Sequence, residues 1–108
     1  LNVHEGPQSI SKFNSIKMSE GMVISNEPGF YKKGKFGIRI ENLLYIKKIK
    51  NKLCFENLTL APIEKELINF KLLNNKEKEY LFKYHLNIYT KLSKFLNSNE
   101  KKWLASYI

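Results

Sequence analysis

The stretch VISNEPGFYKKGKFGIRIEN, residues 23–42, contains two alternating apolar runs, and a glutamate lies at the far end of each. Both runs have the period-two pattern and β-branched residues that are typical of half-buried strands. Pro28-Gly29 and Gly34 between them supply turn chemistry. We therefore expect the two strands to run antiparallel and to bring Glu27 and Glu41 close together.

Two ionised carboxylates side by side repel each other, so the pair needs an explanation. A cation between them, a proton shared by them, or full exposure of both to water would each allow the pair to persist. The pattern of residues alone leaves these three explanations open.

The rest of the chain divides into a sheet portion and a helical tail, which predicts an α+β fold. Strands are expected near residues 21–27, 37–48 and 52–60, with a tight turn at Asn51 between the last two. Apolar residues then recur at three- and four-residue spacing over about 75–96, which predicts an amphipathic helix. That stripe consists of Leu81, Tyr84, Ile88, Leu92 and Phe95. A shorter helix is expected to begin with Ser98 as its N-cap and to continue through Trp103 and Tyr107.

Composition narrows the class of protein. The net charge is +9, but 18 of the 19 basic residues are lysine and only Arg39 is arginine, whereas recognition of bases and phosphates favours the arginine fork. We interpret the lysines as a solvated surface and expect no nucleic-acid partner. No apolar run approaches the roughly 18 residues of a membrane span, and Cys54 is the single cysteine. We expect no membrane partner and a cytoplasmic, reducing location.

Four segments of the chain carry a resemblance to a known family. They are NVHEGP (2–7), EGMVISNEPGFY (20–31), FGIRIENLLYI (36–46) and FENLTLAPIEKELI (55–68). In order and spacing they resemble the C-terminal part of the aminopeptidase P family, the Xaa-Pro aminopeptidases among the pita-bread metallopeptidases. The resemblance implies the C-terminal portion of the pita-bread (creatinase/aminopeptidase) fold over residues 1–62. It also implies a helical C-terminal extension over 63–108 that serves as the dimerisation region of a homodimer.

The resemblance assigns roles to three residues, and position on the strand predicts a role for a fourth. Glu27 matches the glutamate that binds one metal of a dinuclear site, and Glu41 matches the glutamate that bridges both metals. His4 matches a histidine that contacts the substrate without binding metal. Arg39, two residues from Glu41, is expected to orient a ligand carboxylate with its guanidinium. The implied cofactors are two divalent ions, with manganese expected and zinc or cobalt as the alternatives.

The chain also departs from the family pattern, because it has no aspartate and the family uses two as metal ligands. Those ligands, and a metal-binding histidine, are expected before residue 1. We therefore expect the chain, which begins at Leu1, to be a piece of a larger fold and to be inactive alone. The implied activity is removal of an N-terminal residue that precedes proline. The alternatives are a prolidase that cleaves Xaa-Pro dipeptides and a noncatalytic pita-bread module that binds peptides.

Overall fold

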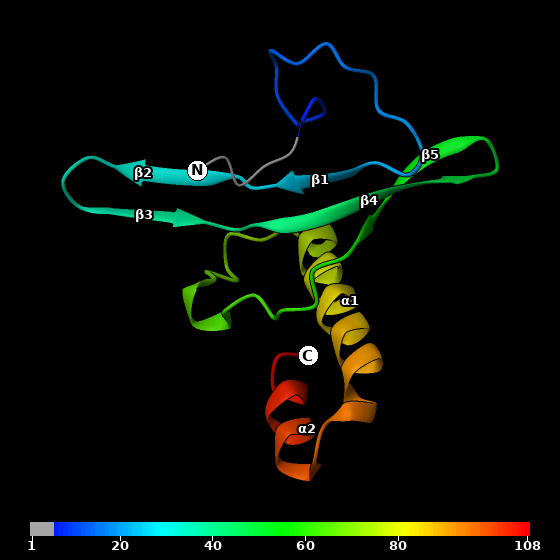
Figure 1. The fold of residues 1–108 in the computed structure, drawn as a ribbon. Helices are drawn as coiled ribbons and strands as arrows, with labels where there is room; N and C mark the ends of the chain where they lie inside the picture. Colours follow the sequence, from blue (N-terminus) through cyan, green and yellow to red (C-terminus); the bar gives the residue numbers. More distant parts are fainter. Residues whose placement is uncertain (1–5) are drawn as a thin grey trace. The chain divides into compact units, whose positions relative to one another are not determined.

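The computed structural model describes residues 6–108, which divide into two compact units. One unit ends at Thr59 and the other spans Leu60–Ile108, and each is described by itself. Among the described residues, the strands belong to the first unit and the helices to the second (Figure 1). The predicted combination of a sheet portion and a helical tail is confirmed, whereas the predicted domain boundary after residue 62 stays a prediction.

The first unit consists of two antiparallel sheets. β1 (Val23–Asn26), β4 (Asn42–Ile49) and β5 (Lys52–Asn57) form a three-stranded sheet in the order β1-β4-β5. β2 (Gly29–Lys32) and β3 (Phe36–Arg39) form a two-stranded hairpin. Figure 1 shows this hairpin continuing along the direction of β1 and β4, so the two sheets form one long ribbon.

The expectation of one continuous strand over residues 37–48 was wrong, because the segment is divided into β3 and β4 at Ile40 and Glu41. Pro28 lies opposite this break. Proline has no backbone N–H and cannot donate to a sheet ladder. The backbone N–H of Ile40 still donates to the carbonyl of Pro28 at 3.1 Å, so the two halves of the ribbon stay joined.

The tight turn between β4 and β5 is confirmed at Lys50 and Asn51. Both residues have positive φ, 47° and 62°, which is the backbone of a type I′ hairpin turn. At positive φ the Cβ of either residue crowds the following carbonyl. The short polar side chain of asparagine offsets this cost with a local hydrogen bond, whereas the lysine side chain does not. The turn is therefore placed by Asn51 and strained at Lys50.

We expect Lys50→Asn to stabilise the β4–β5 hairpin by roughly 0.5–1 kcal/mol, since asparagine adopts positive φ at lower cost. Hydrogen-exchange protection of β4 and β5 amides in the full-length protein measures the change. Lys52→Asn, which removes the same charge from a strand position, is the control and should not raise protection. An equal rise in amide protection in both variants would show that removal of a positive charge, and not the turn conformation, causes the gain.

The second unit consists of two α-helices and two short 3₁₀ turns. α1 spans Asn75–Leu92 and α2 spans Ser98–Ala105, with 3₁₀ turns at Lys65–Leu67 and Ser93–Phe95. The expected helix over 75–96 therefore exists, but its α-helical part ends at Leu92. Among residues 6–108 no helix is both long and apolar enough to cross a membrane.

A capping box begins each α-helix. Asn74 accepts from the N–H of Glu77 at 3.0 Å, and the Glu77 carboxylate accepts from the N–H of Asn74 at 2.9 Å. Asn97 and Glu100 form the same reciprocal pair before α2. The N-cap of α2 is thus Asn97 and the expected Ser98 was wrong, because only Asn97 has a glutamate three residues later.

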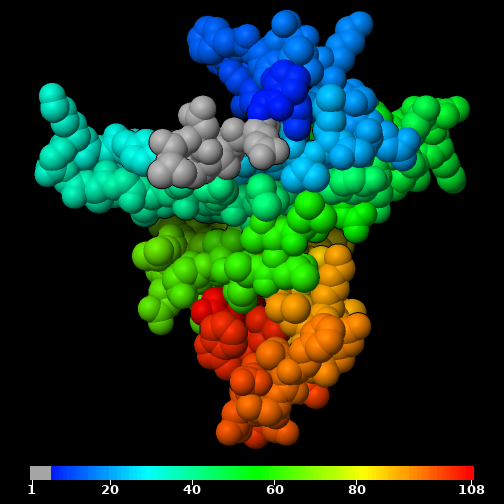
Figure 2. All heavy atoms as spheres, viewed as in Figure 1, coloured from blue at the N-terminus to red at the C-terminus, as the bar shows by residue number. Residues whose placement is uncertain are grey.

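The core of the second unit lies between α1 and α2, and consists of Tyr84, Ile88 and Leu104. Ile88 is fully buried. Figure 2 shows the atoms of the two helices, orange and red, packed closely together. Phe95 is 74% exposed although it belongs to the predicted apolar stripe. The α-helix ends at Leu92 and Phe95 lies in the 3₁₀ turn that follows it, so Phe95 lies beyond the end of the buried helix face.

We expect Ile88→Ala to destabilise the second unit by about 3 kcal/mol, because it removes buried methyl groups and leaves a cavity against Tyr84 and Leu104. The free energy of opening of α1, from hydrogen exchange in the full-length protein, checks the value. Leu86→Ala is the control on the same helix, since Leu86 is 40% exposed. A loss at Leu86 as large as that at Ile88 would contradict this account of the core.

Candidate functional site

Glu27 and Glu41 face each other across the break in the ribbon. β1 and β4 pair up to Asn26↔Asn42, and β2 and β3 pair from Gly29↔Arg39. The register is the same on both sides of the break, so residues 27 and 41 are opposed. The expected antiparallel return is confirmed, and it brings two carboxylates to the one place in the ribbon where the ladder is open.

The guanidinium of Arg39 lies between the two carboxylates. Its Nη2 is 3.1 Å from Oε2 of Glu41, and its Nη1 is 3.6 Å from Oε2 of Glu27. The side chains of Glu27 and Glu41 are 32% and 39% exposed. Repulsion between the carboxylates is thus offset by one cation within the chain and by water, which answers the question raised by their proximity.

Ser25 holds the other oxygen of Glu27. Its hydroxyl donates to Oε1 of Glu27 at 2.7 Å, while Oε2 is the oxygen nearest Arg39. Both oxygens of this carboxylate therefore have a defined direction. Ser25 was not among the predicted site residues, although its position two residues before Glu27 on the same strand face was a signal that could have indicated it.

Tyr31 is a second residue that the sequence did not single out. It lies on the face of the hairpin that carries Arg39, because Gly29 pairs with Arg39 and Tyr31 pairs with Gly37. A Cβ at Gly29 would lie 2.7 Å from the Tyr31 hydroxyl, and a Cβ at Gly37 would lie 2.6 Å from Cδ1 of the ring. The Tyr31 ring occupies the space that side chains at both positions would need, so the two glycines permit its present position.

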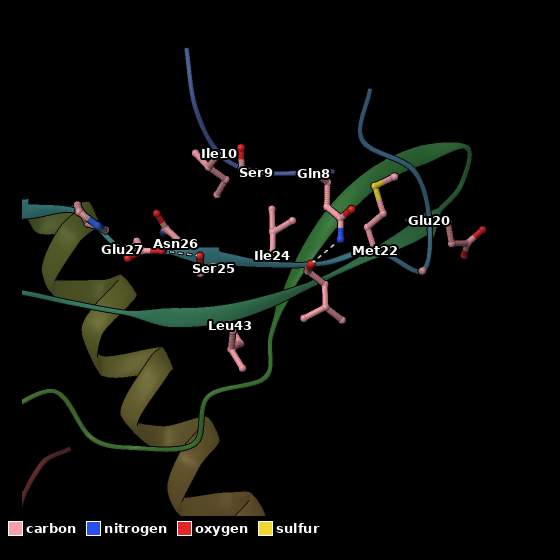
Figure 3. Close-up of a pocket in the computed structure, with 13 residues that line it drawn as sticks. Gln8, Ser9, Ile10, Glu20, Met22, Ile24, Ser25, Asn26, Glu27 and Leu43 are labelled. Atoms are coloured by element: carbon pink, nitrogen blue, oxygen red, sulfur yellow. Dashed lines mark hydrogen bonds between the residues drawn. The ribbon is translucent and has the colours of Figure 1, made fainter. Parts of the chain in front are cut away.

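A hollow of about 1000 Å³ opens beside β1. The loop around Gln8, Ser9 and Ile10 forms one wall and β1 forms another, with Glu27 at the end of the strand (Figure 3). The amide of Gln8 donates to the carbonyl of Val23 at 3.3 Å, which ties the loop to β1. A molecule in this hollow would have access to the Glu27 carboxylate.

Two of the described residues have side chains that could hold a metal ion. Carboxylate oxygens are suitable ligands for hard divalent ions, and Glu27 with Glu41 supplies two such groups on adjacent strands. Within residues 6–108 there is no group of three histidine, cysteine, aspartate or glutamate side chains that could hold a metal ion. The pair therefore fits a site completed by further ligands. The predicted substrate-contacting residue His4 lies outside the described residues.

The sequence matches two models of one family. Residues 1–48 match metallopeptidase family M24, and residues 51–108 match the C-terminal region of peptidase M24. The chain belongs to the metallopeptidase family M24. Together with the strand order described above, this membership defines the class of fold.

The similar proteins include Xaa-Pro aminopeptidases. The chain is 41% identical to a probable Xaa-Pro aminopeptidase P of Laccaria bicolor over 96% of its own length and 18% of the relative's. It is 42% identical to aminopeptidase P2 of Arabidopsis thaliana over 96% and 16%. The structure matches an X-prolyl aminopeptidase of Caenorhabditis elegans, a cytosolic enzyme with a di-nuclear active site. That match has a TM-score of 0.83 and 36% identity over 99% of this chain and 19% of the other. The pita-bread assignment is confirmed, and the chain spans about a fifth of the length of these relatives.

Proposed function

We propose that the chain is the C-terminal part of a metal-dependent Xaa-Pro aminopeptidase, which removes the N-terminal residue of peptides with proline in the second position. The observation that carries the proposal is the carboxylate pair of Glu27 and Glu41, held opposite each other around Arg39 in a chain of family M24. The relatives named Xaa-Pro aminopeptidase P favour this activity over a dipeptidase or a noncatalytic module.

The proposed cofactors are two divalent ions, manganese first. The di-nuclear active site of the structural neighbour supports the number of ions. Glu27 would bind one ion and Glu41 would bridge both. When bound, two ions held close together polarise the peptide carbonyl and activate a water for attack.

The residues of this chain would prepare the ligands for that chemistry. Ser25 fixes one oxygen of Glu27, and Arg39 restrains an oxygen of each glutamate. A guanidinium beside both groups limits their rotation, so less freedom is lost when a cation binds. His4 remains the predicted group that contacts the substrate carbonyl, where a hydrogen bond would stabilise the developing oxyanion.

The activity is tested with the purified full-length protein and three peptides. The first begins Xaa-Pro, the second is the same peptide with an acetylated N-terminus, and the third has alanine in place of proline. We expect release of the first residue from the first peptide only, loss of this release with a chelator, and recovery on adding Mn²⁺. Cleavage of Xaa-Pro dipeptides alone would instead identify a prolidase. Inactivity on all substrates even after Mn²⁺ is added would support a binding module.

We further propose that the protein is a cytoplasmic homodimer. The structural neighbour is described as cytosolic, which supports the location. On α2 the side chain of Trp103 is 58% exposed, so it presents a large aromatic surface that a second copy of the chain could cover. Tyr107, another aromatic residue of the proposed dimerisation region, is half-buried and its hydroxyl donates to Glu64 within the same unit, so Trp103 is the better candidate for the dimer contact.

A further inference from the structure

His85 on α1 lies at the meeting point of two distant segments of the second unit. Its side chain is buried, with 5% exposed. Nε2 of the imidazole accepts a hydrogen bond from the backbone N–H of Ile63 at 3.1 Å, and the ring donates to the backbone of Tyr107. Because one nitrogen accepts while the other donates, the imidazole is neutral in this arrangement.

The same two segments contact each other and α1 at further points. The Tyr84 hydroxyl donates to the carbonyl of Ala61 at 2.7 Å. Nζ of Lys65 donates to the carbonyl of Ser106 at 2.8 Å. We call this arrangement the His85 clasp, defined as His85 with residues 61–65 and 106–107.

A second proton on the imidazole would break the arrangement at Ile63. Nε2 would then carry a hydrogen that points at the N–H of Ile63, so two donors would face each other in a buried place. The two rings packed on the imidazole, those of Tyr84 and Tyr107 at centroid distances of 5.4 and 5.9 Å, carry no carboxylate that could accept that proton.

The charged groups near the clasp contact its tyrosine rather than its imidazole. Glu64 accepts from the Tyr107 hydroxyl at 3.3 Å, and Nζ of Lys65 lies 5.3 Å from the centre of the Tyr107 ring. Within residues 6–108 no carboxylate forms an ion pair with His85. Burial lowers the pKa of His85 below its usual value, and the hydrogen bond to the Tyr107 backbone opposes this only in part.

We propose that the His85 clasp is an acid-sensitive latch, closed while the imidazole is neutral and opened when the imidazole takes up a second proton. Opening frees residues 106–107 and 61–65 from α1. The open form binds a proton that the closed form does not bind, so acid favours opening. A histidine in the open form titrates near 6.5. The opening equilibrium therefore shifts below that pH, by up to tenfold per pH unit.

The test is hydrogen exchange followed by mass spectrometry on the full-length protein at pH 7.5, 6.5 and 5.5. Peptides covering 60–66 and 102–108 report the opening constant, after correction for the intrinsic pH dependence of exchange. We expect a rise of at most about twofold from pH 7.5 to 6.5 and of up to about fivefold from 6.5 to 5.5. The readout does not depend on peptidase activity or on bound metal.

Two variants separate His85 from other groups. His85→Gln keeps a donor and an acceptor but does not titrate, so its opening constant should be independent of pH. Tyr107→Phe loses the hydroxyl that bonds Glu64 and keeps the backbone carbonyl that accepts from His85, so it should retain the pH dependence of the wild type.

A flat opening constant in the wild type, or an unchanged pH dependence in His85→Gln, would overturn the latch. If His85→Gln does not fold, the titration of His85 itself decides the question. Deuterium exchange at the imidazole C2 position in the wild-type protein gives that pKa. A value below 6.5 supports the latch, and a value of 6.5 or above overturns it.

Discussion

Glu41→Gln in the full-length protein is expected to lose bound metal and nearly all peptidase activity. The substitution keeps the shape of the side chain but removes the charge that would bridge two cations. The loss should exceed the roughly 10–100-fold that follows from changing a residue that only orients a ligand. Metal content by atomic emission and the rate of Xaa-Pro cleavage measure the two effects.

Three further substitutions make this experiment specific. Glu27→Gln would weaken one metal site, so it should lose no more metal than Glu41→Gln. Arg39→Lys should keep the metal and lose activity within the 10–100-fold range. Glu56→Gln is the matched control, because Glu56 pairs with Lys47 on the same sheet away from the break. Full metal occupancy in Glu41→Gln would contradict the bridging role.

Trp103→Ala is expected to weaken the proposed homodimer by about three orders of magnitude in Kd. In a contact with twofold symmetry one substitution removes two side chains, and a central aromatic contributes about 2 kcal/mol or more at each place. Light scattering of the full-length protein across a dilution series gives the change.

The control for the dimer is Phe82→Ala, which removes an aromatic side chain that is 49% exposed on α1 and should leave the Kd unchanged. Hydrogen exchange over α1 confirms that the second unit remains folded in both variants. A folded Trp103→Ala protein that stays dimeric at the lowest measurable concentration would exclude this residue from the contact.

The strands of the β1-β4-β5 sheet, the hairpin turn at Asn51 and the long helix could be predicted from the sequence, because each depends on local pattern, whereas β2 was missed. Alternation over residues 23–26 and 42–49 predicts strands in which one face is more buried than the other. Apolar residues at three- and four-residue spacing predict a helix. The proximity of Glu27 and Glu41 followed from the expected turn at Gly34, where the chain reverses between β2 and β3, whereas the turn expected at Pro28-Gly29 was wrong because Gly29 begins β2. These features require only neighbours along the chain.

Other features depended on contacts that the sequence does not reveal. The division of the expected 37–48 strand came from Pro28, which acts on Ile40 across the ribbon rather than along it. The end of the helical stripe before Phe95 came from a change of helix type after Leu92. The first effect arises where two backbones meet across the ribbon, and hydrophobic periodicity carries no information about such a meeting or about the change of helix type.

The sequence by itself determined which residues have the chemistry of a metal site: two glutamates at strand ends, with one arginine two residues from the second. Only the tertiary structure decided how they are arranged. The shared register on both sides of the break opposes the carboxylates, and the guanidinium of Arg39 reaches both because Arg39 pairs with Gly29 at the first rung beyond Pro28. Likewise His85 could be recognised only as a helical histidine in the sequence. Its two hydrogen bonds exist because folding brings residues 63 and 107 to the same side of α1.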